Sequence, residues 1–190
     1  TYPPEVNGVA LTVQGLEQGL RDRGHDVELV RPRQDGDADL APPALPKHVL
    51  LVRGAALPRY PGLKFGLPAT RTLRKRWQLV RPDAIYVATE GPLGWSALRA
   101  ARQLGIPAAT GFHTRFDHYA GHYGLRWLTP LVRGHLRRFH RRAAATLVPT
   151  EALAQELAEL GVDNARQLRR AVDTKLFHPG RRDPALRAHW

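Results

Sequence analysis

Apolar residues in this chain recur at helical spacing in some stretches and form short continuous runs in others. The first helix is predicted over residues 9–23, because four apolar positions fall on one of its faces: Val9, Val13, Leu16 and Leu20. The same kind of spacing predicts four more helices, over residues 68–80, 94–104, 125–143 and 151–160. Short apolar runs predict strands over residues 26–31, 48–53, 84–89, 108–112, 145–148 and 167–170.

The alternation of these strands and helices predicts the fold class. Strands separated by helical segments are typical of βαβ units, in which neighbouring strands run parallel. We therefore expect an α/β fold: a Rossmann-like, doubly wound, mostly parallel sheet with helices on both faces. Residues 34–46 and 57–62 are rich in turn-forming and small residues, which predicts surface loops.

The two ends of the chain bear on its domain organisation. Residues 1–177 are expected to form one domain, and residues 178–190 a linker followed by the start of a helix, with Asp183 as its N-cap. The loop before residue 9 would normally follow a strand, and none precedes Thr1. We therefore expect the chain to begin one strand late within a larger protein and to end inside a helix.

Composition sets broad limits. The 190 residues are enough for one α/β domain, and the content of 43% hydrophobic and 24% charged residues is ordinary for a soluble globular protein. No stretch approaches the roughly 20 apolar residues of a membrane span. The chain has no cysteine, which excludes disulfides and thiolate chemistry and suits a reducing cytoplasm.

The charge of the chain is strongly positive, with a formal net charge of +12, and most of its basic residues are arginine. They gather in two clusters, over residues 71–81 and 126–142, and no carboxylate lies between Asp117 and Glu151. One interpretation is attraction to a phospholipid surface, a nucleic acid or a phosphorylated substrate. The other is a solvated surface of an arginine-rich protein. Because no nucleic-acid motif accompanies the charge, a membrane is the favoured anionic partner.

Three loops follow predicted strand ends, where open α/β sheets bind ligands. The first, residues 5–8, contains Gly8 and leads into a helix N-terminus, where free N–H groups favour a phosphate. Asn7 would add polar contacts, although a plain tight turn has the same composition. The dinucleotide fingerprint G-x-G-x-x-G is absent, which counts against NAD or FAD.

The second loop contains Glu90, between an apolar strand and a Gly-Pro turn. Its carboxylate could bind sugar hydroxyls or could complement the dipole of the following helix. The third loop begins with His113 at a strand end, where an imidazole can hydrogen-bond a substrate or stabilise developing charge. A metal site at His113, His118 and His122 is not favoured, because glycines interrupt the segment. His135 and His140 are assigned no function.

Taken together, five motifs resemble the N-terminal half of family 4 glycosyltransferases, which are retaining enzymes of the two-domain GT-B fold. They lie in the same order as in that family, at residues 1–10, 88–94, 112–116, 148–151 and 172–179. The resemblance covers essentially the whole chain. It is closest to the branch that transfers mannose, usually from GDP-mannose, to phosphatidylinositol-type or other glycolipid acceptors.

This resemblance implies roles for particular residues. His113 would be the catalytic residue and lie against the transferred sugar, and Gly8 would contact the donor diphosphate through its backbone. Acceptor contacts are implied for Asn7, Glu90, Thr114 and Tyr119. No metal or other cofactor is implied. Most of the nucleotide would bind a C-terminal domain that is absent here, so the chain alone would turn over little or nothing.

The basic residues would then meet anionic lipid, peripherally, at the cytoplasmic inner face of the plasma membrane. Those expected to face the membrane are Arg71, Arg74, Lys75, Arg76, Arg133, Arg137, Arg138 and Arg141. Two other classes of function remain open. The chain could be a non-catalytic basic module that binds anionic lipid or polysaccharide, or, less favoured, a nucleic-acid binder.

Overall fold

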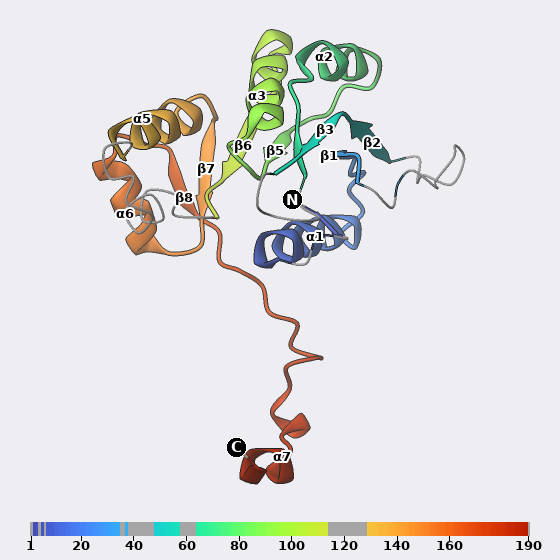
Figure 1. Ribbon diagram of the computed structural model, residues 1–190, viewed down its shortest axis with the longest axis vertical. Helices are drawn as coiled ribbons and strands as arrows, with labels where there is room; N and C mark the ends of the chain where they lie inside the picture. Colours follow the sequence, from blue (N-terminus) through green and yellow to red (C-terminus); the bar gives the residue numbers. More distant parts are fainter. Residues whose placement is uncertain are drawn as a thin grey trace.

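The computed structural model of the protein describes residues 2, 3, 5, 7–34, 37, 48–57, 64–113 and 129–189. Its centre is a sheet of four parallel strands in sequential order (Figure 1). These strands are β5 (Ile85–Val87), β6 (Ala108–Gly111), β7 (Ala145–Val148) and β8 (Ala165–Gln167). The connecting helices are α3 (Pro92–Leu104), α5 (Thr129–His140) and α6 (Glu151–Glu159). This arrangement confirms the Rossmann-like α/β fold class.

Two further helices flank the strands. Figure 1 shows α2 (Thr70–Leu79) beside α3 on one side of the strands and α1 (Gly8–Arg21) on the other. Helix α1 begins as predicted because the Asn7 side chain accepts a hydrogen bond from Ala10 N at 2.9 Å, which caps its first turn. None of the helices among the described residues has both the length and the apolar character needed to cross a membrane.

Four short strands lie outside the central sheet. Strands β1 (Leu29–Pro32) and β2 (Val49–Val52) pair in parallel, as the sequence pattern indicates. Strands β3 (Gly54–Ala56) and β4 (Lys64–Gly66) form an antiparallel pair that was not predicted. Three residues are too few to show an alternating pattern. In addition, a Cβ at Gly54 would lie 2.9 Å from the Pro32 Cβ, so this close approach of β3 to β1 requires glycine.

Most predicted boundaries differ from the structure by one to three residues, and the first strand begins at Leu29 instead of residue 26. The last strand is β8, over residues 165–167 instead of 167–170, because its pairing with β7 begins at Ala165 opposite Thr146. Leu168 N still bonds to Val148 O at 2.8 Å, after which the chain leaves the sheet. Helix α5 is described from Thr129, and residues 125–128 of the predicted helix lie outside the described residues.

The core consists of two apolar clusters that meet along α5. One joins α2, α3, β5 and β6 through residues such as Leu73, Trp77 and Leu98, and includes Phe139 of α5. The other joins α5, β7 and α6 through Leu136, Val148 and Leu157. Helix α5 is therefore held from two sides, which fixes the residues that project from it.

The C-terminal segment contributes nothing to this core. Residues 168–189 are all exposed and include a short 3-10 helix, η3 (Pro179–Arg181), and a final helix, α7 (Pro184–His189). Figure 1 shows this segment extending away from the sheet. Asp183 accepts hydrogen bonds from Ala185 N and Leu186 N, so it caps α7 as its sequence predicts.

Candidate functional site

The carboxyl ends of β5 and β6 bring two of the predicted site residues to one edge of the sheet. Glu90 lies three residues after β5, and His113 lies two residues after β6. The two strands are parallel neighbours, with Val87 opposite Thr110, so the segments that follow them emerge side by side. Open α/β sheets bind ligands at this edge.

His113 is held by a tyrosine from the neighbouring strand. The hydroxyl of Tyr86 on β5 lies 2.7 Å from His113 Nε2, and the two rings meet edge to face. A Cβ at Gly111 would lie 2.1 Å from the Tyr86 hydroxyl oxygen and 2.5 Å from His113 Nε2. The pair can form only because residue 111 has no side chain.

The environment keeps both members of this pair uncharged. Burial lowers the pKa of His113, the nearby Arg170 lowers it further, and Glu90 opposes the shift. Burial also raises the pKa of Tyr86 to about 12, with Glu90 adding to the effect. At neutral pH a phenol therefore faces a neutral imidazole. Because Tyr86 occupies Nε2, a ligand would meet the ring at Nδ1.

Behind Glu90 lies a histidine that is buried completely. His140, at the end of α5, is 0% exposed, and its Nε2 lies 3.3 Å from Glu90 Oε1. The contact lacks hydrogen-bond geometry, and both atoms are buried. On its other side, His140 Nδ1 lies 2.8 Å from the hydroxyl of Thr110, which is also 0% exposed.

Thr110 begins a buried chain of polar groups whose hydrogens can be assigned. The Asn164 amide donates to His140 O at 3.1 Å and Ala143 O at 2.7 Å, so its oxygen must accept the Thr146 hydroxyl at 3.1 Å. Thr110, which is 3.2 Å from Thr146, can then give its own hydrogen to His140 Nδ1. That choice places the ring hydrogen on Nε2, toward the Glu90 carboxylate.

Asn7 and Gly8 form a separate part of the site. Gly8 opens α1, and a Cβ there would meet nothing within 4 Å, so packing does not explain the glycine. Asn7 has a structural task as the N-cap of α1. Among the described residues, no contact joins these two residues to Glu90 or His113. The predicted acceptor contacts Thr114 and Tyr119 lie outside the described residues.

Comparison with known proteins identifies the family. The pattern described as Glycosyltransferase Family 4 matches residues 6–176. The chain belongs to glycosyltransferase family 4. The site just described is therefore the sheet edge of a glycosyltransferase domain.

The names of individual relatives specify different sugars. A GDP-mannose-dependent alpha-mannosyltransferase from Mycobacterium tuberculosis (strain CDC 1551 / Oshkosh) is 30% identical over 100% of this chain and 50% of its own length. Sulfoquinovosyl transferase SQD2 of Arabidopsis thaliana is 26% identical over 96% of this chain and 36% of its own. Alpha-monoglucosyldiacylglycerol synthase of Acholeplasma laidlawii is 26% identical over 85% and 42%. The chain spans half or less of the length of these three relatives.

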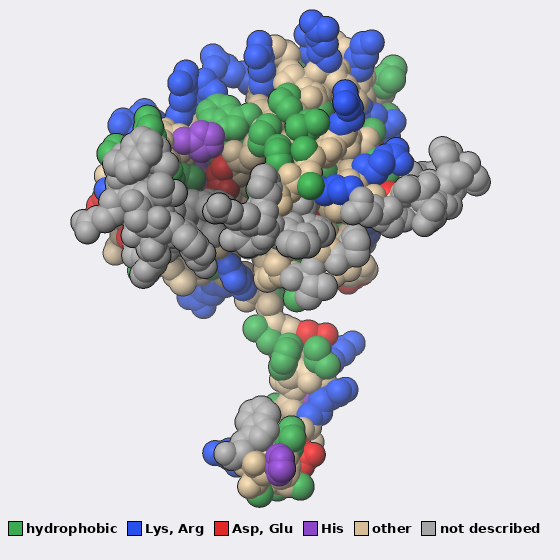
Figure 2. All heavy atoms as spheres, viewed as in Figure 1, with side chains coloured by type: hydrophobic (Ala, Val, Ile, Leu, Met, Phe, Trp, Pro, Cys, Tyr) green, Lys and Arg blue, Asp and Glu red, His purple; other side chains and the backbone are tan. Residues whose placement is uncertain are grey.

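In this family 4 chain, the residues expected to face the membrane form two groups, those that are exposed and one that pairs with a carboxylate. Arg71, Arg74 and Lys75 on α2 are exposed, as are Arg133, Arg137, Arg138 and Arg141 on or just after α5. Arg76 is different, because its guanidinium binds the Glu28 carboxylate at 2.6 and 2.7 Å. Figure 2 shows basic side chains along the upper edge of the molecule.

Two residues of the family 4 site were missed in the sequence. Tyr86 lies inside an apolar strand, where a tyrosine gives no functional signal. His140, in a basic helix, was assigned no function. A signal for its burial was present, because it follows Leu136 by four positions and so lies on the apolar face of α5.

Proposed function

We propose that this chain is the acceptor-binding half of a retaining glycosyltransferase that transfers a mannosyl group from GDP-mannose to a lipid-linked or glycolipid acceptor. The observation that carries the proposal is a neutral His113, held by Tyr86 beside Glu90, at the ligand-binding edge of a family 4 domain. The name of the 30% identical relative supports GDP-mannose as the donor. The name of the synthase relative supports a lipid acceptor.

Each residue then has a distinct task. His113 directs Nδ1 toward the transferred sugar, and its neutral state lets it hydrogen-bond without adding a full charge. Glu90, oriented by His140, accepts hydrogen bonds from acceptor hydroxyls. The open backbone at Gly8 admits the donor diphosphate, whose developing negative charge is stabilised without a metal ion. Asn7, Thr114 and Tyr119 complete the acceptor side.

The basic helices place the protein at a membrane. Exposed basic residues of α2 and α5 attract the anionic lipid of the inner face of the plasma membrane, and the protein is peripheral to it on the cytoplasmic side. Each basic residue near such a surface contributes about 1 kcal/mol, so several together are enough for reversible attachment. The acceptor lipid and the enzyme are thereby held at the same surface.

The test uses the complete coding sequence that contains this chain, with radiolabelled GDP-mannose and an extract of host lipids. We expect transfer of label into lipid, and we expect His113→Ala to lower kcat about 100-fold or more. His25→Ala is the matched control, because His25 is exposed and lies in the turn after α1. Label transferred from UDP-glucose instead would overturn the choice of donor, and equal activity of the two variants would overturn the role of His113.

The basic surface supports a second candidate, a non-catalytic module that binds anionic lipid or polysaccharide. The two candidates differ in what Gly8 and His113 do. If the wild-type protein transfers no sugar, and its salt-sensitive binding to anionic vesicles is unchanged by substitution of both residues, the module becomes the better description.

A further inference from the structure

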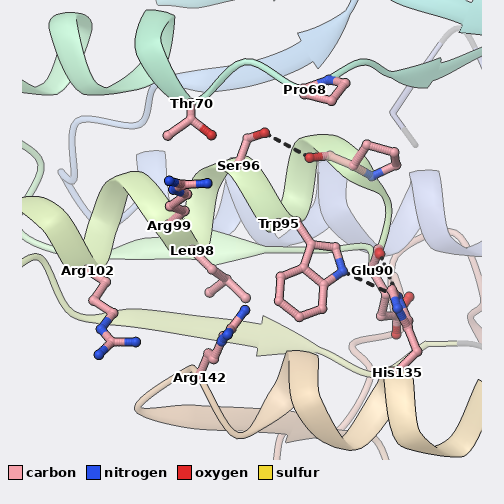
Figure 3. Close-up of a pocket in the computed structure, with 11 residues that line it drawn as sticks. Pro68, Thr70, Glu90, Trp95, Ser96, Leu98, Arg99, Arg102, His135 and Arg142 are labelled. Carbon is pink, nitrogen blue, oxygen red and sulfur yellow. Dashed lines mark hydrogen bonds between the residues drawn. The ribbon is translucent and has the colours of Figure 1, made fainter.

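A groove runs along α3 between α2 and α5, and Glu90 is among the residues that line it (Figure 3). Its volume is about 630 Å³, and its floor includes Trp95, Arg99 and Arg102 of α3. One wall is the start of α2, fixed to α3 because Ser96 Oγ accepts a hydrogen bond from Ala69 N at 3.0 Å. The opposite wall is formed by α5 and the residue Arg142 that follows it.

Three arginines line the groove. Arg99 and Arg102 are exposed and lie three positions apart on α3, so both project from the same side of the helix. Arg142 approaches from the opposite wall, with its guanidinium carbon 4.7 Å from the centre of the Trp95 ring. Within the described part of the chain, none of the three has an acidic partner.

Glu90 is the one acidic residue among the described residues that line the groove, and its carboxylate faces His140 instead of the arginines. Its side chain is 10% exposed, and Oε1 faces the buried His140. The guanidinium groups are therefore left without a counter-charge in a partly enclosed space. Arginine forms paired hydrogen bonds to phosphate oxygens, so the chemistry of this end of the groove fits a phosphate group.

Trp95 gives the groove a rigid centre. Its indole Nε1 donates to His135 Nε2 at 3.3 Å, and its ring packs edge to face against Phe139 at 5.3 Å between centroids. Phe139 is 0% exposed and belongs to the core. The ring is thus already ordered before any ligand arrives, which lowers the entropic cost of binding.

A second hollow continues the groove across α5. Its volume is about 590 Å³, and it shares Trp95, His135 and Arg142 with the first. Its other lining residues include Leu131, whose side chain is 67% exposed. A leucine exposed to this degree beside unpaired arginines favours a ligand that is both anionic and apolar.

We propose that the two joined hollows bind one molecule of an anionic phospholipid. Its phosphate lies among Arg99, Arg102 and Arg142, and its glycerol and first acyl carbons lie along Trp95 and Leu131. This inference rests on the proposed function in one respect, which is that the protein attaches to a membrane that contains anionic lipid. It adds a defined lipid site between α2, α3 and α5, which adjoins the proposed acceptor site at Glu90.

The test follows the Trp95 indole N–H signal in ¹H–¹⁵N NMR spectra of the 190-residue chain. The probe is dihexanoyl phosphatidylglycerol, kept below the concentration at which it forms micelles so that no membrane surface is present. We expect a saturable shift of the Trp95 signal, which Trp95→Phe assigns by its loss. Dihexanoyl phosphatidylcholine and inorganic phosphate are expected to bind at least about tenfold more weakly. Phosphatidylcholine keeps the phosphodiester but adds a cationic choline that the arginines repel, and inorganic phosphate lacks the apolar part.

A charge-matched pair of variants decides whether the site is specific. Arg99→Gln with Arg102→Gln should weaken phosphatidylglycerol binding at least about tenfold. Arg181→Gln with Arg187→Gln removes the same charge from the exposed C-terminal segment, and should leave binding within twofold. Arg142→Lys keeps the charge but loses the planar guanidinium, and should also weaken binding.

Three results would overturn the lipid site. Equal weakening in both double variants would mean that only net charge matters. Equal binding of phosphatidylcholine would mean that the site does not select an anionic lipid. Equal binding of inorganic phosphate would mean that the apolar part is not used. None of these measurements involves sugar transfer. If lipid binding fails but mannosyl transfer succeeds, the lipid site is wrong and the proposed function stands. If lipid binding succeeds but no mannose is transferred, the lipid site stands and the proposed function is wrong.

Discussion

Two polar regions of this protein are separated by the ring of Phe139. Its centroid lies 5.2 Å from that of His140 on the inner side and 5.3 Å from that of Trp95 on the outer side. On the inner side, buried hydroxyl, amide and imidazole groups have partners at 2.7–3.3 Å. On the outer side, three arginines line a groove, and none of them pairs with an acidic side chain in the part of the chain that the structure describes. We infer that the buried polar groups around His140 position the site, whereas the arginines of the groove are available to bind a ligand.

This difference has an energetic basis. A buried polar group without a partner costs free energy, and on the inner side the hydroxyl and amide groups of Thr110, Thr146 and Asn164 all have partners. Exposed guanidinium groups remain solvated and cost little when unpaired. Substitutions on the inner side should therefore change stability strongly, and substitutions on the outer side should change ligand binding instead.

The largest loss of stability is expected for His140→Ala. The substitution leaves a cavity beside Phe139 and removes the partner of Thr110 and Glu90, so we expect the free energy of unfolding to fall by about 3–5 kcal/mol. Urea denaturation of both proteins measures it. His25→Ala, which truncates an exposed histidine, should change stability by about 0.5 kcal/mol or less. Similar losses in the two variants would show that the buried chain does not stabilise the fold.

A smaller loss is expected for Gly111→Ala. The new methyl group would overlap the Tyr86 hydroxyl and His113 Nε2, and both side chains must move, at a cost of about 1–3 kcal/mol. The control is Gly134→Ala on α5, where a Cβ would meet nothing within 4 Å. There alanine should stabilise the helix by up to about 1 kcal/mol. Opposite signs in thermal unfolding would confirm the close contact at residue 111.

The next effect depends on pH. The folded pKa of His113 is lowered from its usual 6.5, so between these values the unfolded state binds more protons than the folded state. The stabilising contribution of neutral His113 is complete above pH 6.5 and declines as the pH falls below it. The free energy of unfolding should therefore fall more steeply from pH 7 to pH 5 in the wild type than in His113→Gln. Parallel pH profiles would contradict burial of this ring.

The smallest effect on stability is expected on the outer side. Arg99→Gln with Arg102→Gln should change the free energy of unfolding by no more than about 0.5 kcal/mol, since neither side chain has a partner among the described residues. Urea denaturation again measures it. A large loss would mean that these arginines support the fold and would remove the contrast between the two regions.

The sequence was sufficient to predict those elements that carry a strong periodic pattern. Helix α2 buries Leu73 and Trp77, which are four positions apart and so share one face, and α6 begins after Thr150, whose side chain caps its first turn. The parallel order of the central strands also agrees with the alternation of strands and helices. Strands β3 and β4 could not be predicted, because each has three residues and their pairing depends on contacts with distant parts of the chain.

The candidate site was predictable only in part. The strand ends indicated Glu90 and His113, since both follow apolar runs directly. The partners that orient them were not predictable, because Tyr86 precedes His113 by 27 positions, and Glu90 and His140 are brought together only by the packing of α5 on the sheet. Positions in a sequence do not reveal which buried hydroxyls face one another.

Asn164 affects which segments of this domain unfold locally together. A single amide joins the end of α5, strand β7 and the residues leading into β8, through His140 O, Ala143 O and Thr146. Segments tied in this way are expected to open together. The backbone amide protons of the last turn of α5 and of β7 should therefore exchange with deuterium at a common, slow rate. The basic residues of α5, which we expect to face the membrane, would then be carried on a slowly opening part of the domain, so the membrane would meet a surface already in place.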